Sequence, residues 1–85
     1  MAKKKNIVTE QSVWSPKLTR LGKTIRKLRR AKQYSKVNLA ALAWTNPDYI
    51  DRVERGEEDV VFVTLVRIAR ALGMSTAKLM RKSKL

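Results

Sequence analysis

Residues 35–56 read SKVNLAALAWTNPDYIDRVERG and predict two short helices joined by a tight turn. The second helix begins at Asn46-Pro47, because an Asn side chain accepts from the free amides of a first turn and Pro is tolerated at the first helical position. At about 100° per residue, Ile50 and Val53 fall on one side of this helix. The opposite face has no packing role, and it carries Asp48, Asp51, Arg52 and Arg55.

The flanking sequence predicts further helices around this pair. An apolar stripe predicts a helix over residues 16–32, and it consists of Leu18, Leu21, Ile25 and Leu28. Gly22 lies within this helix, where Gly costs roughly 1 kcal/mol relative to Ala. Similar patterns predict helices over residues 61–72 and 76–81, the last of them capped by Ser75.

A longer pattern of residues carries a family resemblance. It runs without a gap from about Leu18 to Leu79 and rests on Ser35, Lys36, Leu39, Ala40, Asn46, Tyr49, Ile50, Arg52, Val53, Glu54, Arg55, Gly56, Leu65, Ile68, Ala69, Leu72 and Gly73. This pattern resembles the Cro and phage-repressor (XRE-type) helix-turn-helix family. The resemblance implies an all-α, five-helix lambda-repressor-like helix-turn-helix domain. In this family the second helix crosses the DNA backbone, the third lies in the major groove, and the protein usually binds as a homodimer.

Composition excludes several function classes. The 85 residues allow one domain with a modest core. The chain has no His and no Cys, which excludes imidazole and thiol chemistry, Cys/His metal sites and disulfides. No apolar run approaches the ~20 residues of a membrane helix, and the N-terminal lysines precede no signal-peptide core. We therefore expect a soluble, cytoplasmic protein that needs no cofactor and is not an enzyme.

The charge predicts a polyanionic partner, because the net value of +13 is strongly one-sided. Its distribution along the chain is uneven. Residues 1–36 carry +11, residues 37–60 carry −4 and residues 61–85 carry +6. The basic charge thus frames the central motif without lying on it. A solvated surface with no partner is the alternative interpretation.

The N-terminal residues 1–14 are interpreted as a basic flexible arm, since Lys3, Lys4 and Lys5 belong to no convincing periodicity. Such an arm can follow the phosphates around a duplex and become ordered on binding. A plain disordered terminus is the alternative. We assign residues 15–82 to the helix-turn-helix DNA-binding domain and residues 83–85 to a frayed tail.

One ion pair is predicted inside the domain. Glu54 lies about 40° from Ile50 on the inward side of its helix, and an unpaired buried carboxylate is costly. Arg29 lies at the edge of the first apolar stripe, and the family pattern pairs these two positions. We expect an Arg29–Glu54 ion pair with a structural role.

The outward face of residues 47–55 carries the candidate base readers. Arg52 is the strongest, because a guanidinium can donate two hydrogen bonds to guanine O6 and N7. Asp48 and Asp51 can accept from cytosine N4, although DNA phosphates repel them. The alternative is intrahelical pairing of Asp48 with Arg52 and of Asp51 with Arg55, which are spaced i, i+4.

The remaining candidate contacts come from the resemblance and from charge. By resemblance, Asn46 is assigned to base reading and Tyr49 to the DNA backbone. Lys36 begins its helix at a family position that commonly contacts a phosphate, and Arg55 is a second candidate. Lys3, Lys4 and Lys5 of the arm complete the set of predicted backbone contacts.

Two features depart from the family pattern. Trp44 occupies the position where the family usually has Gly, and a left-handed backbone there costs other residues on the order of 1 kcal/mol. It predicts a strained or an altered turn, with the ring covering the junction of the two helices in preference to contacting DNA. The three carboxylates of Glu57, Glu58 and Asp59 occupy a linker that often touches phosphates in the family, and phosphates would repel them.

These features predict a sequence-specific transcriptional regulator that reads double-stranded DNA with residues 47–55 as a homodimer. One alternative is an antitoxin-like regulator that also binds a protein partner through exposed Val63, Met74 and Met80. The other is a sequence-indifferent nucleic-acid-binding protein that depends on the lysines alone. No residues form a catalytic constellation.

Overall fold

Five helices and no strand form the part of the chain that the computed structural model describes, which is residues 2–85 with side chains from Pro16 onward. They are α1 (Ala2–Ala31), α2 (Lys36–Leu42), α3 (Pro47–Glu54), α4 (Phe62–Ala71) and α5 (Thr76–Lys82). The predicted all-α, five-helix fold is confirmed. None of these helices is both long enough and apolar enough to cross a membrane.

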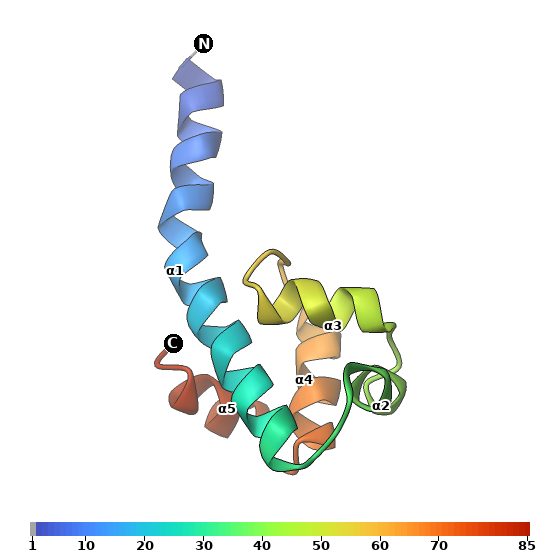
Figure 1. Cartoon of the computed structure of the whole chain (residues 1–85). Helices are drawn as coiled ribbons and strands as arrows, with labels where there is room; N and C mark the ends of the chain where they lie inside the picture. The colour runs from blue at the N-terminus through green and yellow to red at the C-terminus, as the bar shows by residue number, and fades with distance from the viewer. Residues whose placement is uncertain (1) are drawn as a thin grey trace.

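The helices enclose one core. Helix α1 packs against α3 and α5, α2 packs against α3 and α4, and α4 packs against α5. Figure 1 shows the N-terminal half of α1 extending beyond the body that the shorter helices form. The buried apolar side chains are Leu21, Ile25, Leu39, Ala40, Ala43, Ile50, Val53, Leu65, Ile68, Ala69, Leu72 and Leu79. The core therefore lies beneath α3 and leaves the opposite face of that helix outside.

The first helix begins earlier than the sequence predicted. We expected it to start at Pro16, because Pro suits a first turn, but α1 begins at Ala2 and Pro16 lies inside it. The fixed φ of Pro16 is compatible with a helix, but Pro lacks the main-chain N–H and its ring crowds the carbonyl of residue i−4, so its place inside α1 costs about 3 kcal/mol. The side chains of Lys3, Lys4 and Lys5 lie outside the described part of the structure, and their role as DNA contacts stays a prediction.

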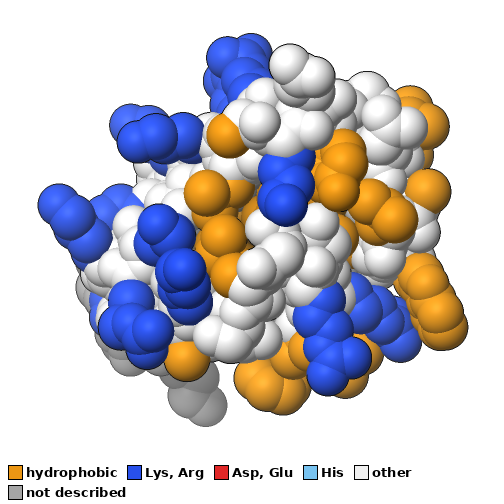
Figure 2. All heavy atoms as spheres, turned by 90° about the horizontal axis from the view of Figure 1, so that it is seen from below, with side chains coloured by type: hydrophobic (Ala, Val, Ile, Leu, Met, Phe, Trp, Pro, Cys, Tyr) orange, Lys and Arg blue, Asp and Glu red, His pale blue; other side chains and the backbone are white. Residues whose placement is uncertain are grey.

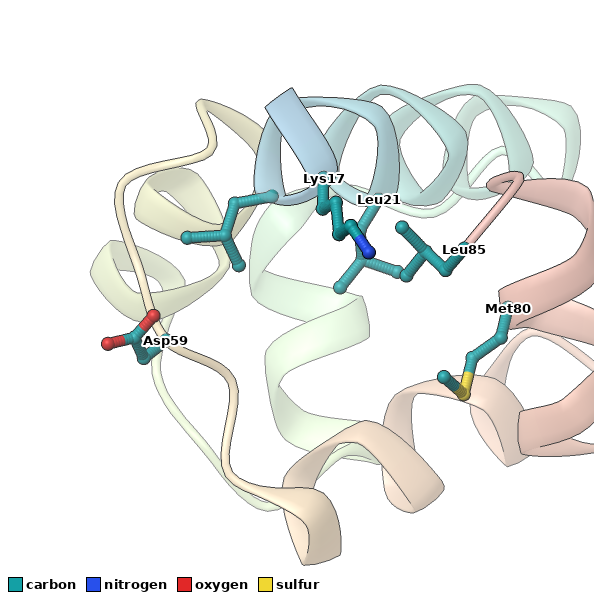
Figure 3. Close-up of a pocket in the computed structure, with 6 residues that line it drawn as sticks. Lys17, Leu21, Asp59, Met80 and Leu85 are labelled. Atoms are coloured by element: carbon teal, nitrogen blue, oxygen red, sulfur yellow. The ribbon is translucent and has the colours of Figure 1, made fainter. Parts of the chain in front are cut away.

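The C-terminal residues are ordered against the body, which corrects the expected frayed tail at residues 83–85. Ser83 is buried, and its hydroxyl donates to the Leu79 carbonyl oxygen at 2.8 Å. The Leu85 amide donates to the Met80 carbonyl oxygen at 3.0 Å. Figure 3 shows Leu85 beside Leu21 in a pocket between α1 and α5. These contacts end α5 with a defined cap.

Candidate nucleic-acid interface

Side-chain caps fix the starts of α2 and α3. The hydroxyl of Ser35 accepts from the Asn38 amide at 2.9 Å, and the Asn38 side chain accepts from the Ser35 amide at 3.1 Å. This reciprocal pair is a capping box. The Asn46 side chain accepts from the Tyr49 amide at 2.9 Å, and Pro47 is the first residue of α3. The predicted start of the second helix is confirmed.

The turn between α2 and α3 has a left-handed residue at Trp44. Trp44 has φ +60°, which is the left-handed region that favours Gly. The Thr45 amide donates to the Ala40 carbonyl oxygen at 2.9 Å and the Trp44 amide to Ala41 at 3.3 Å, the pattern of a Schellman cap. Trp44 is therefore strained, as one of the two predicted outcomes required.

The ring of Trp44 lies elsewhere than predicted. We expected it to cover the junction of α2 and α3, but the residue is 78% exposed. The guanidinium of Arg67, on α4, lies over the ring at 4.9 Å from its centroid. The Trp44 ring thus makes a cation–π contact with α4 instead of covering the junction of α2 and α3.

Substitutions at Trp44 test the strain directly. Asn tolerates a left-handed backbone, whereas a β-branched Val does not, and both remove the ring. We expect Trp44→Val to be less stable than Trp44→Asn by about 1 kcal/mol, which lowers the thermal midpoint by about 4–8 °C in a domain of this size. Thermal unfolding followed by circular dichroism measures the difference. Equal midpoints for the two variants would contradict a left-handed turn at this position.

One face of α3 packs against the body of the protein, and the other is accessible to solvent. Ile50, Val53 and Glu54 are buried on the inner face. On the outer side, Asn46, Asp48 and Arg52 are exposed and Asp51 is half-buried. All four predicted base readers thus lie along one accessible side of the α2–α3 motif. Asp48 makes no ion pair with any residue that the structure describes.

The predicted ion pair ties α3 to α1. Arg29 Nε donates to Glu54 Oε2 at 2.6 Å, and Arg29 Nη2 donates to Glu54 Oε1 at 3.0 Å. Arg29 Nη1 also donates to the Tyr34 carbonyl oxygen at 2.9 Å. Both ionic side chains are buried, and the hydrogen bond to Glu54 raises the pKa of Arg29. This bidentate pair fixes the end of α3 and the connection that leads to α2.

Ion pairs on the outer side hold the three predicted DNA-contacting cations whose side chains the structure describes, Lys36, Arg52 and Arg55. Asp51 accepts from Lys36 of α2, and this hydrogen bond lowers the pKa of the Asp51 carboxyl group. Asp51 also pairs with Arg55 at 2.9 Å, as its i, i+4 spacing predicted. Arg52 does not form the alternative pair with Asp48 and pairs instead with Glu58, at 2.8 Å.

Tyr49 points toward the core instead of outward. Its hydroxyl oxygen is buried beside Val61 and Thr64, and burial raises the pKa of the phenol. A buried hydroxyl cannot donate to a phosphate, so the geometry does not favour the predicted backbone contact of Tyr49. The ring instead packs against the core and lies 5.8 Å, centroid to Cζ, from the guanidinium of Arg52.

The acidic side chains are grouped in one part of the structure, as they are in the sequence. In the described residues from Pro16 onward, every acidic side chain lies between Asp48 and Asp59, on α3 and the loop that follows it. Figure 2 shows the underside of the molecule, where basic side chains border apolar ones and no acidic side chain is visible. The described acidic residues do not form a group able to hold a metal ion.

The comparisons with known proteins agree with this architecture. The model of a family described as a helix-turn-helix domain matches residues 20–81. The chain belongs to this family. It is thus a DNA-binding transcription regulator of the XRE type, as the sequence pattern predicted. No curated protein sequence matches the chain significantly.

Two solved structures resemble this helix-turn-helix protein over most of their length. One is the restriction-modification controller protein C.AhdI from Aeromonas hydrophila, which is 35% identical, has a TM-score of 0.71, and matches over 73% of this chain and 94% of its own. The other is the clp gene regulator ClgR from Corynebacterium glutamicum, which is 28% identical, has a TM-score of 0.76, and matches over 80% of this chain and 72% of its own.

Sequence reasoning missed the contact between Arg52 and Glu58. The loop of residues 57–59 was considered only as a source of repulsion toward phosphates. The contact could have been predicted from Gly56, because a Gly directly after a helix predicts a left-handed cap that reverses the chain. That reversal brings one of the loop carboxylates back beside α3.

Proposed function

We propose that this helix-turn-helix protein binds specific sequences of double-stranded DNA as a homodimer and regulates transcription from those sites. Helix α3 enters the major groove, and its outer residues read base edges. Each protomer contacts one half-site of a near-palindromic operator, the usual geometry of this motif. Both solved relatives are described as controller or regulator proteins, which supports the regulatory part of the proposal.

The observation that carries the proposal is the solvent-accessible outer face of α3. Apolar residues and a buried ion pair fasten its inner face to the body. The outer face carries a guanidinium, two carboxylates and an amide at its start, and these are hydrogen-bonding groups with matching partners on base edges. A helix held this way can present them as a rigid set.

Selection of bound sequences from random duplex DNA tests both specificity and assembly. We expect a symmetric motif whose half-sites are about one helical turn apart. Binding without enrichment of any motif would favour the sequence-indifferent alternative. An asymmetric motif would contradict the homodimer while leaving sequence reading intact.

Two alanine variants distinguish contacts with DNA bases from contacts with DNA phosphates. Arg52→Ala should relax the preference at one base pair of each half-site by about 1–3 kcal/mol, because it removes a base contact. Lys36→Ala should weaken all sequences alike and reduce the salt slope of binding by about one unit, because it removes a phosphate contact. Titrations of operator and mismatched duplexes at several salt concentrations measure both quantities.

Arg81→Ala supplies the matched control, since Arg81 is an exposed cation on α5, which lies away from α3 in Figure 1. It should leave the base preference unchanged. If Arg52→Ala and Lys36→Ala reduced affinity uniformly for every sequence, α3 would not be the reading element.

One observation favours the protein-binding alternative as a second function. Val61, Phe62 and Val63, at the start of α4, are 63%, 68% and 51% exposed. Val63 and Met80 are exposed as that alternative requires, whereas Met74 packs against the core. The apolar start of α4 is thus the place where a protein partner would bind.

A further inference from the structure

The guanidinium of Arg52 is held from two sides. Its Nε donates to Glu58 Oε1 at 2.8 Å, and its Cζ lies 5.8 Å from the centroid of the Tyr49 ring. Of the N–H groups of Arg52, these contacts use only that of Nε. Within the described part of the chain, Nη1 and Nη2 of Arg52 donate to no protein acceptor. Those two nitrogens form a donor pair that can bind guanine O6 and N7 together.

The loop after α3 brings Glu58 to this position. Gly56 has φ +75°, and the Glu57 amide donates to the Arg52 carbonyl oxygen at 2.9 Å while the Gly56 amide donates to Val53 at 3.0 Å. This Schellman cap reverses the chain at the end of the helix. After this reversal the side chain of Glu58, two residues beyond Gly56, lies beside Arg52 of α3.

The three carboxylates of the loop have different surroundings. Glu58 is the least exposed of the three, with 27% of its side chain accessible compared with 56% for Glu57, and Asp59 is exposed as well. Glu57 lies 3.6 Å from Arg55, a weaker contact. Asp59 lies on the far side of the loop, at the edge of the pocket in Figure 3. Only Glu58 contacts a candidate base reader.

We propose that Glu58 is a positioning residue for base recognition, which holds Arg52 so that Nη1 and Nη2 face a guanine. The inference rests on the proposed function of α3. An arginine has many rotamers, and fixing it before binding reduces the entropy lost when the base contact forms. The carboxylate also repels phosphates, so it lowers affinity for DNA in general while favouring the one arrangement in which Arg52 reads its base.

Two variants of Glu58 distinguish the effect of its hydrogen bond with Arg52 from the effect of its negative charge. Glu58→Gln keeps an oxygen that accepts from Nε, whereas Glu58→Ala removes it, and both remove the charge. We expect both to bind DNA more tightly overall. Glu58→Ala should also lose roughly fivefold or more of the discrimination at the base pair that Arg52→Ala identifies, and Glu58→Gln should keep most of it.

The control is Glu57→Ala, which removes the same charge from the same loop. It should raise overall affinity and leave every base preference unchanged. In an Arg52→Ala background, Glu58→Ala should change discrimination at no base pair, because the residue that it positions is absent. Titrations against the four variants of each operator base pair give these ratios.

Three results would overturn the inference. Sharper discrimination in Glu58→Ala would show that the carboxylate competes with guanine instead of presenting Arg52. A loss of discrimination that persists without Arg52 would show that Glu58 reads a base itself. Unchanged preference in Arg52→Ala alone would refute the proposed reading by α3, and this outcome is distinguishable because it needs no Glu58 variant.

Discussion

Glu54→Gln should destabilise the domain by about 3 kcal/mol or more, because it leaves the guanidinium of Arg29 buried without its counter-charge. Arg29 is 7% exposed and donates two hydrogen bonds to the carboxylate that this change neutralises. For a domain of this size the thermal midpoint should fall by about 12 °C or more. Thermal and urea unfolding of the two proteins measure the loss.

Glu57→Gln is the matched control, since Glu57 is an exposed carboxylate three residues further along the chain. Its effect should stay within about 0.5 kcal/mol. A double variant, Arg29→Met with Glu54→Leu, should recover part of the loss, because apolar side chains of similar volume often replace a buried pair at little cost. Equal midpoints for Glu54→Gln and Glu57→Gln would show that the pair does not stabilise the fold.

The sequence predicted the features that local chemistry controls. Asn46-Pro47 fixed the start of α3 because capping depends on neighbouring residues alone. The inward position of Glu54 followed from helical periodicity, and its need for a partner followed from the cost of a buried charge. The family resemblance then identified that partner as Arg29. These three steps place α3 against α1 and define which side of α3 is free.

Other features depended on the path of the chain in space. The alternative pairing of Arg52 with Asp48 does not form, because i, i+4 spacing identifies neighbours within a helix but not a carboxylate that returns from a loop. The ring of Trp44 lies by Arg67 of α4, and no pattern within the α2–α3 motif contains that contact. Residues 83–85 gain their order from contacts with α5, which helix periodicity alone does not indicate.

Gly22 shows the largest difference between propensity and packing. By helix propensity alone, replacing Gly22 with Ala would stabilise α1 by roughly 1 kcal/mol. In the structure, a Cβ atom at Gly22 would lie 2.3 Å from the Val53 carbonyl oxygen and 2.6 Å from that of Glu54. Both atoms belong to the backbone of α3, so no change of rotamer can relieve the overlap. Gly22 therefore permits the close approach of the two helices.

Gly22→Ala should consequently destabilise the domain by a net of about 2 kcal/mol or more, against the gain expected from helix propensity. Thermal unfolding should show a midpoint lower by about 8 °C or more. Lys23→Ala is the control, because Lys23 is exposed on the same helix and its replacement should change stability by less than about 0.5 kcal/mol. A Gly22→Ala protein as stable as the wild type would mean that α1 and α3 do not approach this closely.

The two stability predictions are coupled through Glu54. Gly22 and Arg29 are two helical turns apart on the same face of α1, where one admits the backbone of Glu54 and the other binds its carboxylate. In the single variant Gly22→Ala, the added Cβ would displace α3 and so lengthen the Arg29–Glu54 ion pair, although Glu54 itself is unchanged. The loss in a Gly22→Ala, Glu54→Gln double variant should therefore be smaller than the sum of the single losses by about 0.5 kcal/mol or more. Strict additivity would mean that the glycine and the ion pair hold α3 independently.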